Sequence, residues 1–344
     1  MVYNFATKVF TARFRRMHDL TTLILNRLAD EKNFLSGERL CQEFGITRSA
    51  VWKHIRLLRS DGYQIEAVTG RGYRLSAMTG RPVEAEVLPF LKCRYLGKQI
   101  DYHPIATSTN LLAKAMAVAG APEGCIVVAD AQSGGKGRMG RVWHSPPGVN
   151  LYCSLILRPA VPSIRVPQLT LLLAAAIHRA LLELSPELEA MIKWPNDILV
   201  NGKKLCGVLC EMQSEPDLTH FVVAGIGINV NQSEISPELK GSATSLILER
   251  GELFSRPSLL ALILNHFEPL YDEWLLQDDL TFVLPALESC ALLQSKEVTI
   301  DQRNRILSGT VTGIAKGGEL KLRCADGEAL LVSSGEAHLR KQEL

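Results

Sequence analysis

The sequence predicts a multidomain α+β protein that begins with a small helical domain. At 344 residues the chain suits about two or three domains, and its 47 % hydrophobic content is enough for a large buried core. Helical periodicity marks most of residues 18–77, whereas strand patterns bounded by Gly, Pro and Asn-Gly turns alternate with helices beyond residue 82. We expect the segment AMTGRP, residues 77–82, to link the two regions.

Composition and charge narrow the class of protein. The formal net charge is only +2, so any nucleic-acid-binding surface must be local. The eight cysteines include no C-x-x-C pair, which favours reduced thiols and a cytoplasmic protein. The longest apolar run, residues 169–184, is interrupted by His178 and Arg179 and is too short and polar to span a bilayer. We expect a buried helix there and no membrane association.

The first residues are basic and carry no acid. Lys8, Arg13, Arg15 and Arg16 superficially suit a transit peptide, but the segment has no small-residue cleavage signature. We therefore expect residues 1–17 to be a disordered basic extension.

Residues 18–77 are typical of a winged helix-turn-helix domain. Apolar residues recur at helical spacing from Leu20 to Leu28, and a second helical segment, GERLCQEF, follows Ser36 as a possible N-cap. Gly45 then breaks the chain before a third helix, which completes the helix-turn-helix pattern. The stretch YQIEAVTGRGYRLS predicts two short strands that form a hairpin, or wing.

The third helix, RSAVWKHIRLLRS, predicts a DNA-reading surface. Thr47 is placed to cap it, and Val51, Ile55 and Leu58 form an inward stripe. No acid occurs from residue 46 to 59, and an unbroken positive face suits contacts in a major groove, although many small helical domains have one basic solvated face. The basic residues are Arg48, Lys53, Arg56 and Arg59, with His54. We expect DNA contacts from Arg48, Ser49, Lys53, Arg56 and, on the wing, Arg71.

The stretch GGKGRMGR, residues 134–141, fits the G-x-G-x-x-G spacing of a dinucleotide-binding turn but lacks its context. A strand, CIVVAD, precedes it, yet Pro146 and Pro147 exclude the helix that should follow, and NLYCSLIL reads as another strand. Lys136 is not followed by Ser or Thr, so a phosphate-binding P-loop is excluded too. We expect a flexible loop between two strands.

Three cations in this glycine-rich loop suggest an anionic ligand. Glycines let the backbone approach a ligand closely, while Lys136, Arg138 and Arg141 can donate charge-assisted hydrogen bonds to anionic oxygens. The alternative is a solvated basic loop.

The stretch IKWPNDILVNGKKLCGVLCE, residues 192–211, places a lysine at the end of an apolar segment. Asn201-Gly202 predicts a hairpin. Lys193, between isoleucine and tryptophan, is partly desolvated, where its charge acts on an anion with little screening. Asp197 offers a structural alternative, because it can pair with this lysine; the sequence leaves both open.

Two further segments have polar ends. In ATSTN, residues 106–110, Ser108, Thr109 and Asn110 are good helix-capping residues and also good partners for a neutral polar ligand. In FVVAGIGINV an apolar strand runs into Asn229, and its glycines permit either close ligand approach or tight packing.

Taken together, STN, QSGGKGRxGRxW, KWPND and GIGIN behind a helix-turn-helix resemble the bifunctional biotin protein ligases that also repress biotin synthesis. The resemblance covers nearly all of residues 18–344. Lys136 departs from it, because many members have arginine there; the charge is kept but bidentate geometry is lost. The resemblance implies a central mixed α/β domain like that of class II aminoacyl-tRNA synthetases, residues 82–292, and an SH3-like β-barrel, residues 293–344.

The resemblance also implies the chemistry. ATP, with Mg²⁺, would activate biotin to biotinyl-5'-adenylate, and biotin would pass to a lysine of the biotin carboxyl carrier protein of acetyl-CoA carboxylase. The adenylate would also serve as corepressor, with a homodimer on operator DNA. Lys193 and Arg138 would offset repulsion between carboxylate and α-phosphate. We expect no protein metal ligands. The expected biotin and adenylate contacts are Ser108, Thr109, Asn110, Gln132, Gly135, Lys136, Gly137, Arg138, Trp143, Lys193 and Asn229.

Two alternatives remain. One is a lipoate-type or other acyl-adenylate ligase that shares the same domain. The other is a ligand-sensing transcription factor whose ligase domain is inactive.

Overall fold

A computed structural model describes residues 20–302 and 305–340, so the expected extension over residues 1–17 lies outside the described residues. The chain forms two compact units that divide after Arg81, within the segment AMTGRP. Each unit is described by itself below.

The N-terminal unit has the expected winged helix-turn-helix. A helix over residues 20–30 is followed by two further helices and an antiparallel hairpin: α2 (Gly37–Phe44), α3 (Arg48–Ser60), β1 (Gln64–Val68) and β2 (Gly72–Ala77). Ser36 Oγ accepts a hydrogen bond from Arg39 N at 3.1 Å and Thr47 Oγ1 accepts one from Ala50 N at 3.2 Å, as helix N-caps do. Gly45 ends α2 in the left-handed conformation, with φ 63°.

The inward stripe of α3 is confirmed, but two of its basic residues make contacts inside the domain. Val51, Ile55 and Leu58 are buried. His54 is buried as well, and its Nδ1 lies 2.8 Å from Thr21 Oγ1; burial lowers its pKa. The guanidinium of Arg59 turns back to donate two hydrogen bonds to the Ile65 carbonyl oxygen. His54 is therefore part of the core, while Arg59 stays exposed but uses its guanidinium to tie α3 to β1.

The second unit is built on one seven-stranded sheet with the order β3-β4-β5-β9-β8-β7-β6. Only the β3–β4 pair is parallel; all other neighbours are antiparallel. Because β4 and β5 pair antiparallel, the glycine-rich stretch between them is the expected strand-to-strand loop. The strands are β3 (Gln99–His103), β4 (Cys125–Ala129), β5 (Leu151–Leu157), β6 (Ala190–Lys193), β7 (Asp197–Val200), β8 (Lys203–Ser214) and β9 (Thr219–Ile228).

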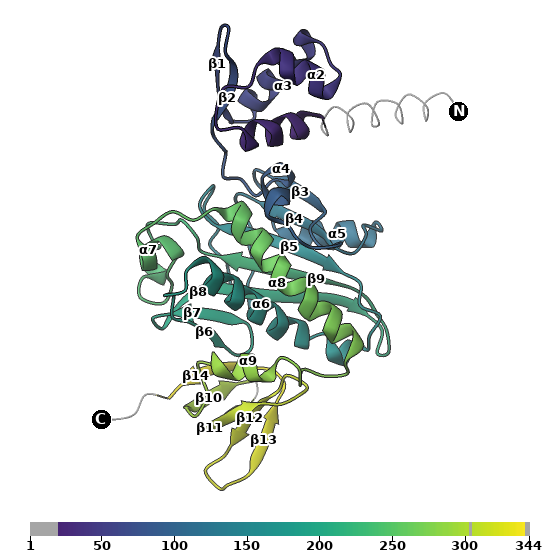
Figure 1. Cartoon of the computed structure of the whole chain (residues 1–344). Coiled ribbons are helices and arrows are strands. Elements are labelled where there is room, and N and C mark those ends of the chain that lie inside the picture. Colours follow the sequence, from purple (N-terminus) through teal and green to yellow (C-terminus); the bar gives the residue numbers. More distant parts are fainter. Residues whose placement is uncertain (1–19, 303–304, 341–344) are drawn as a thin grey trace. The chain divides into compact units, whose positions relative to one another are not determined.

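Helices cover both faces of this sheet. In Figure 1, α6 (Gln168–Leu184) and α8 (Arg256–Leu276) lie across one face and bury the larger apolar core with alternate strand residues such as Ile126 and Val128. The intervening residues Cys125 and Val127 face α5 (Thr109–Val118) in a smaller core. The remaining helices and turns are α4 (Glu84–Val87), η1 (Leu88–Phe90), η2 (Arg138–Gly140), η3 (Ser163–Arg165), η4 (Pro237–Leu239), α7 (Leu246–Arg250) and α9 (Leu284–Ser289).

The apolar run around α6 is a core helix, as expected. Ser163–Leu184 is the one described segment long and apolar enough for a membrane span by composition, and 67 % of its 18-residue apolar window is buried inside the protein. Its apolar surface is therefore already used by the fold.

A small β domain follows, with the strand order β13-β12-β11-β10-β14. Short turns at Lys316–Gly318 and around Asp326-Gly327 separate β11 from β12 and β12 from β13. The β-rich C-terminal domain is thus confirmed. Its strands are β10 (Glu297–Asp301), β11 (Ile306–Ile314), β12 (Leu320–Arg323), β13 (Ala329–Val332) and β14 (Glu336–Leu339).

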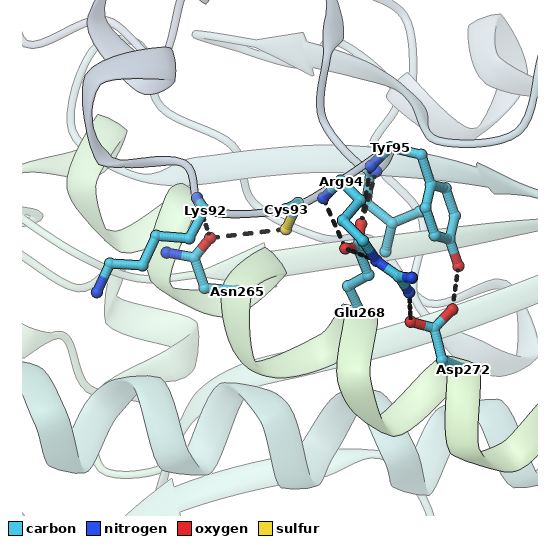
Figure 2. Close-up of polar contacts among 8 residues, drawn as sticks. Lys92, Cys93, Arg94, Tyr95, Asn265, Glu268 and Asp272 are labelled. Carbon is cyan, nitrogen blue, oxygen red and sulfur yellow. Dashed lines mark hydrogen bonds and ion pairs between the residues drawn. The ribbon is translucent and has the colours of Figure 1, made fainter.

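One buried carboxylate fastens the start of the second unit to α8 (Figure 2). Glu268 Oε1 accepts a hydrogen bond from Arg94 N at 2.7 Å, and its Oε2 accepts from Tyr95 N at 3.1 Å and Leu96 N at 2.9 Å. Asp272 binds the Arg94 guanidinium and the Tyr95 hydroxyl. Burial alone would raise the pKa of Glu268, but these hydrogen bonds outweigh it and hold that pKa below its usual range.

Replacing this carboxylate should destabilise the second unit. In Glu268→Gln one oxygen becomes an NH₂ group that faces a backbone donor, and an unsatisfied buried donor costs about 2 kcal/mol. We expect a lower urea midpoint at pH 7, followed by tryptophan fluorescence, since three of the four tryptophans lie in this unit.

The same variant has a defined pH dependence. Because the folded pKa of Glu268 is lowered, its contribution is present above the unfolded pKa and is lost as the pH falls through the folded value. The difference between parent and variant should narrow on acidification. Exposed Glu252→Gln is the control. Equal midpoints for Glu268→Gln and the parent at pH 7 would contradict the assignment.

Candidate active site

The residues of the four quoted motifs meet around one cavity of about 580 Å³ in the second unit. Its walls come from the start of α5, the glycine-rich loop, the β6–β7 turn, strands β8 and β9, and β14 of the C-terminal domain. The sequence-predicted residues that line it are Ser108, Thr109, Asn110, Gln132, Lys136, Gly137, Arg138, Trp143, Lys193 and Asn229.

Arg138 holds the glycine-rich loop against the β6–β7 turn. Its Nη1 donates a hydrogen bond to Asn196 Oδ1 at 2.9 Å, and Gly137 N donates to the Arg141 carbonyl at 2.7 Å to close the loop upon itself. Burial lowers the pKa of Arg138, against the opposing effect of nearby Asp197. A guanidinium with so high an intrinsic pKa still carries its charge at neutral pH.

Arg141 does not serve the cavity as a free cation. It forms a two-pronged ion pair with the Glu336 carboxylate of β14, with Nη1 2.7 Å from Oε1. This pair lowers the pKa of Glu336 and raises that of Arg141. The sequence-based expectation that all three loop cations reach anionic ligand oxygens is corrected here, because one of them is neutralised within the protein.

Lys193 and Asp197 are register partners on β6 and β7, yet they form no ion pair. Asp197 Oδ1 lies 2.8 Å from Lys204 Nζ and also accepts a hydrogen bond from Asn196 Nδ2 at 2.9 Å. The two residues that flank Lys193 are buried, as expected. Among described residues Lys193 has no carboxylate partner, which resolves the alternative that the sequence left open.

Gln132, and not Ser108, caps α5. Ser108 occupies the N-cap position without a side-chain capping bond, whereas Gln132 Oε1 accepts a hydrogen bond from Thr109 N at 2.9 Å. Gln132 Nε2 in turn donates to Ser145 Oγ at 3.1 Å. The Ser108 hydroxyl is therefore left facing the cavity.

Trp143 lies over glycines of two strands. A β-carbon on Gly227 would lie 2.6 Å from the indole, and one on Gly207 would lie 3.0 Å from it. Lys204 Nζ lies 5.3 Å from the centre of the ring, within the range of a cation–π contact. The glycines of β9 thus make room for side chains of the site.

Two of the expected contact residues have internal roles. Gly135 does not line the cavity; a β-carbon there would lie 2.7 Å from the Trp143 carbonyl oxygen, so the residue permits close backbone packing. Asn229 lines the cavity but donates through Nδ2 to the Thr244 carbonyl at 2.9 Å.

Sequence reasoning missed several cavity residues. Asn196 and Lys204 line the cavity, but no sequence pattern assigned a role to either: Asn196 belongs to the quoted KWPND motif, and Lys204 follows the Asn201-Gly202 turn. Glu336 and His338 come from β14, more than a hundred residues beyond the last quoted motif. No local pattern marked these two, because only the tertiary fold brings them to the cavity.

The first unit presents the expected basic helix face. Arg48, Ser49, Lys53 and Arg56 are all exposed on α3. Arg56 lies over the ring of Trp52, which is 56 % exposed, at 5.1 Å. On the wing, Arg71 lies over Phe34 at 4.5 Å.

Three family models match the chain in the order of its domains. Residues 21–74 match the HTH domain, residues 102–229 the Biotin/lipoate A/B protein ligase family, and residues 296–340 the Biotin protein ligase C terminal domain.

Whole-chain comparisons agree. A Bacillus subtilis protein named Bifunctional ligase/repressor BirA is 44 % identical over 83 % of this chain and 86 % of its own length, and an Escherichia coli protein of the same name is 28 % identical over 90 % and 94 %. The structure of a biotin protein ligase from Aquifex aeolicus in complex with biotin and ATP matches with a TM-score of 0.62 and 29 % identity, over 71 % of this chain and 99 % of that one. The chain belongs to the family of bifunctional ligase/repressor proteins named BirA.

Proposed function

We propose that this chain activates biotin with ATP, transfers it to a lysine of a biotin carboxyl carrier protein, and represses transcription of biotin-synthesis genes when it holds the adenylate. The observation that carries the ligase assignment is the convergence of Lys193 and Arg138, neither paired with a carboxylate among described residues, on one cavity. The names of the relatives and the helix-turn-helix support the double role.

The two cations reduce the electrostatic repulsion that opposes adenylate formation, which is the first step. The biotin carboxylate must approach the α-phosphate of ATP, and the two anions repel each other. Positive groups fixed in a partly desolvated site reduce that repulsion most as the new acyl–phosphate bond forms and pyrophosphate leaves. Lys193, at the end of β6, and Arg138, in the glycine-rich loop, supply that charge.

In the second step the neutral amine of the acceptor lysine attacks the acyl carbon of the adenylate and AMP leaves. Ser108, Thr109 and Gln132 line the neutral polar end of the cavity, and we assign the ureido ring of biotin to this end. Trp143 and the backbone of β8 and β9 form the adjoining wall.

Mg²⁺ fits this site only as an ion carried by the nucleotide. The nearest carboxylates, Asp197 and Glu336, are paired with Lys204 and Arg141, and the described residues include no group of three metal-ligating side chains. Mg²⁺ bound to triphosphate oxygens would supply further charge neutralisation there.

The repressor role rests on the exposed basic face of α3 and on the wing. We assign phosphate and base-edge contacts to Arg48, Ser49, Lys53, Arg56 and Arg71. A homodimer formed on adenylate binding would present two such helices to a palindromic operator. All eight cysteines are free, which suits the cytoplasm.

Removal of the Lys193 charge should strongly slow adenylate formation. We expect Lys193→Ala to slow adenylate formation by roughly 30- to 1000-fold while the fold is kept, because the lost contact acts mainly in the transition state. The measurement is biotin-dependent pyrophosphate release, with mass spectrometry for the adenylate. Exposed Lys203→Ala at the start of β8 is the matched control. Near-normal pyrophosphate release by Lys193→Ala would contradict a role for Lys193 in adenylate formation.

The same assay separates the alternatives. A lipoate-type ligase would form an adenylate from lipoate in place of biotin, and a sensor with an inactive ligase domain would form none with either acid.

Opening the glycine-rich loop should release the intermediate. Arg138→Gly removes the hydrogen bond to Asn196 and adds backbone freedom, so we expect adenylate to leave about ten- to a hundredfold faster. Free adenylate acylates any accessible neutral amine, so serum albumin added as a bystander should become biotinylated, more at higher pH where more lysine is neutral. Unlabelled albumin together with unchanged adenylate release would show that Arg138 does not retain the intermediate.

DNA binding should require the first unit and respond to ligand. Gel shifts with duplexes selected from a random library should show tighter binding when biotin and ATP are both present, and none after deletion of residues 1–77. Lys53→Ala should weaken binding and lower the salt slope by about one ion. Arg39→Ala, whose guanidinium is already paired with Glu43, is the control. Binding that is indifferent to biotin and ATP would refute the coupling.

A further inference from the structure

We propose that Trp52 and Arg56 of α3 act as a pair that reads a guanine and a thymine on the neighbouring base pair, in the major groove of the operator. The inference rests on the proposed repressor function, because it names the bases that this helix recognises. Trp52 determines specificity in this proposal, although it carries no charge.

Trp52 is the exception on the outer face of α3. It is 56 % exposed, whereas the apolar residues of the inward stripe are buried. Residues four apart on a helix share a face, so Trp52 lies in one line between Arg48 and Arg56. No acid occurs from residue 46 to 59. An apolar ring within a positive face suits a polyanion that also presents apolar groups, and duplex DNA does so through the thymine methyls of its major groove.

Arg56 is held by Trp52 and keeps its hydrogen-bond donors free. Its guanidinium carbon lies over the indole, 5.1 Å from the centre of the ring. The other two arginines of α3 are engaged: Arg48 lies 3.7 Å from the Glu38 carboxylate, and Arg59 donates to the Ile65 carbonyl. Within the described part of the chain the Arg56 guanidinium forms no ion pair or hydrogen bond. Its N–H edge is therefore available to a base.

The stacking contact prepares Arg56 for base recognition. An arginine loses side-chain entropy when it is fixed in one geometry, and a contact that already restrains the guanidinium reduces that loss on binding. The indole covers one face of the guanidinium and leaves its edge exposed. That edge matches guanine, whose O6 and N7 atoms accept two hydrogen bonds from one arginine.

The position of the indole follows from this contact. A guanidinium that binds the guanine edge through two hydrogen bonds lies in the plane of that base. An indole stacked on the guanidinium then lies at the level of an adjacent base pair, because base pairs are about 3.4 Å apart along the duplex. The apolar group that the major groove presents there is the thymine methyl. The Trp52–Arg56 pair therefore selects a thymine next to a guanine, whereas a phosphate contact by Arg56 would select no base.

The test uses the full chain with biotin and ATP, and fluorescence anisotropy on a duplex that the parent selects from a random library. In matched duplexes, each thymine beside a guanine is replaced in turn by deoxyuridine, which lacks only the methyl group. Each such guanine is likewise replaced by 7-deazaguanine, which lacks the N7 acceptor. At one guanine–thymine neighbour, deoxyuridine should weaken binding about fourfold, the value of one buried methyl group, and 7-deazaguanine should weaken it at least about fivefold.

Variants assign these two effects to the pair. Trp52→Phe keeps an aromatic face and should still distinguish thymine from deoxyuridine. Trp52→Ala should bind the selected duplex about tenfold more weakly and the thymine and deoxyuridine duplexes equally. Arg56→Ala should become insensitive to 7-deazaguanine. Lys53→Ala, which loses a phosphate contact, should bind more weakly but keep both discriminations. Leu23→Ala is the matched control, because Leu23 is an apolar residue of the first helix that is 52 % exposed, and it should change nothing.

The outcomes distinguish this proposal from the repressor assignment. A parent that binds no duplex with sequence specificity would overturn the repressor assignment. A parent that binds its selected duplex specifically but tolerates deoxyuridine beside every guanine would overturn the pair and leave that assignment in place. The same conclusion would follow if Trp52→Ala kept the parental discrimination, or if Arg56→Ala lowered the salt slope and stayed sensitive to 7-deazaguanine. The deoxyuridine comparison uses the parent chain, so it does not depend on the folding of any variant.

Discussion

The candidate active site depends on two partly buried cations, Arg138 and Lys193, whose charges are not neutralised by a carboxylate of the protein. Arg138 and Lys193 sit close to two carboxylates, those of Asp197 and Glu336, each of which would cancel their charge. The fold prevents this by giving each carboxylate another partner: Lys204 takes Asp197 and Arg141 takes Glu336. Arg138 is left with the neutral oxygen of Asn196. Positive potential is thus available to a ligand because the surrounding ion pairs are already complete.

The antiparallel centre of the sheet makes this arrangement possible. Strands β8 and β9 pair along most of their length, and glycines at positions 207, 225 and 227 leave space above them. Trp143 fills part of that space from the glycine-rich loop and Asn110 fills another part from α5. The helices on the opposite face supply the rigid apolar support. Small residues on one face leave space for the polar side chains of the site, and the dense core on the other face holds the strands beneath them in place.

Local patterns in the sequence predict most helices and strands and most of the residues that line the cavity. The caps at Ser36 and Thr47 and the Asn201-Gly202 hairpin are short-range features, and such features survive folding almost unchanged. Long-range partners were not accessible in the same way. The ion pair of Arg141 with Glu336, the burial of His54 and the contact of Arg59 with the Ile65 carbonyl depend on which surfaces meet, and charge alone does not encode that. Glycine at position 135 suggests a ligand contact because glycine permits close approach, but its close neighbour is the Trp143 backbone carbonyl.

The Arg141–Glu336 pair also orders events during synthesis. Translation proceeds from the N-terminus, so the glycine-rich loop, the lysine of β6 and the glycines of β9 all leave the ribosome well before β14 does. Until Glu336 emerges, Arg141 remains an unclaimed third cation beside Arg138 and Lys193. A chain without β14 would therefore keep one more unpaired cation at the glycine-rich loop than the folded protein does, so the charge beside the cavity is set by a strand almost two hundred residues further along the chain.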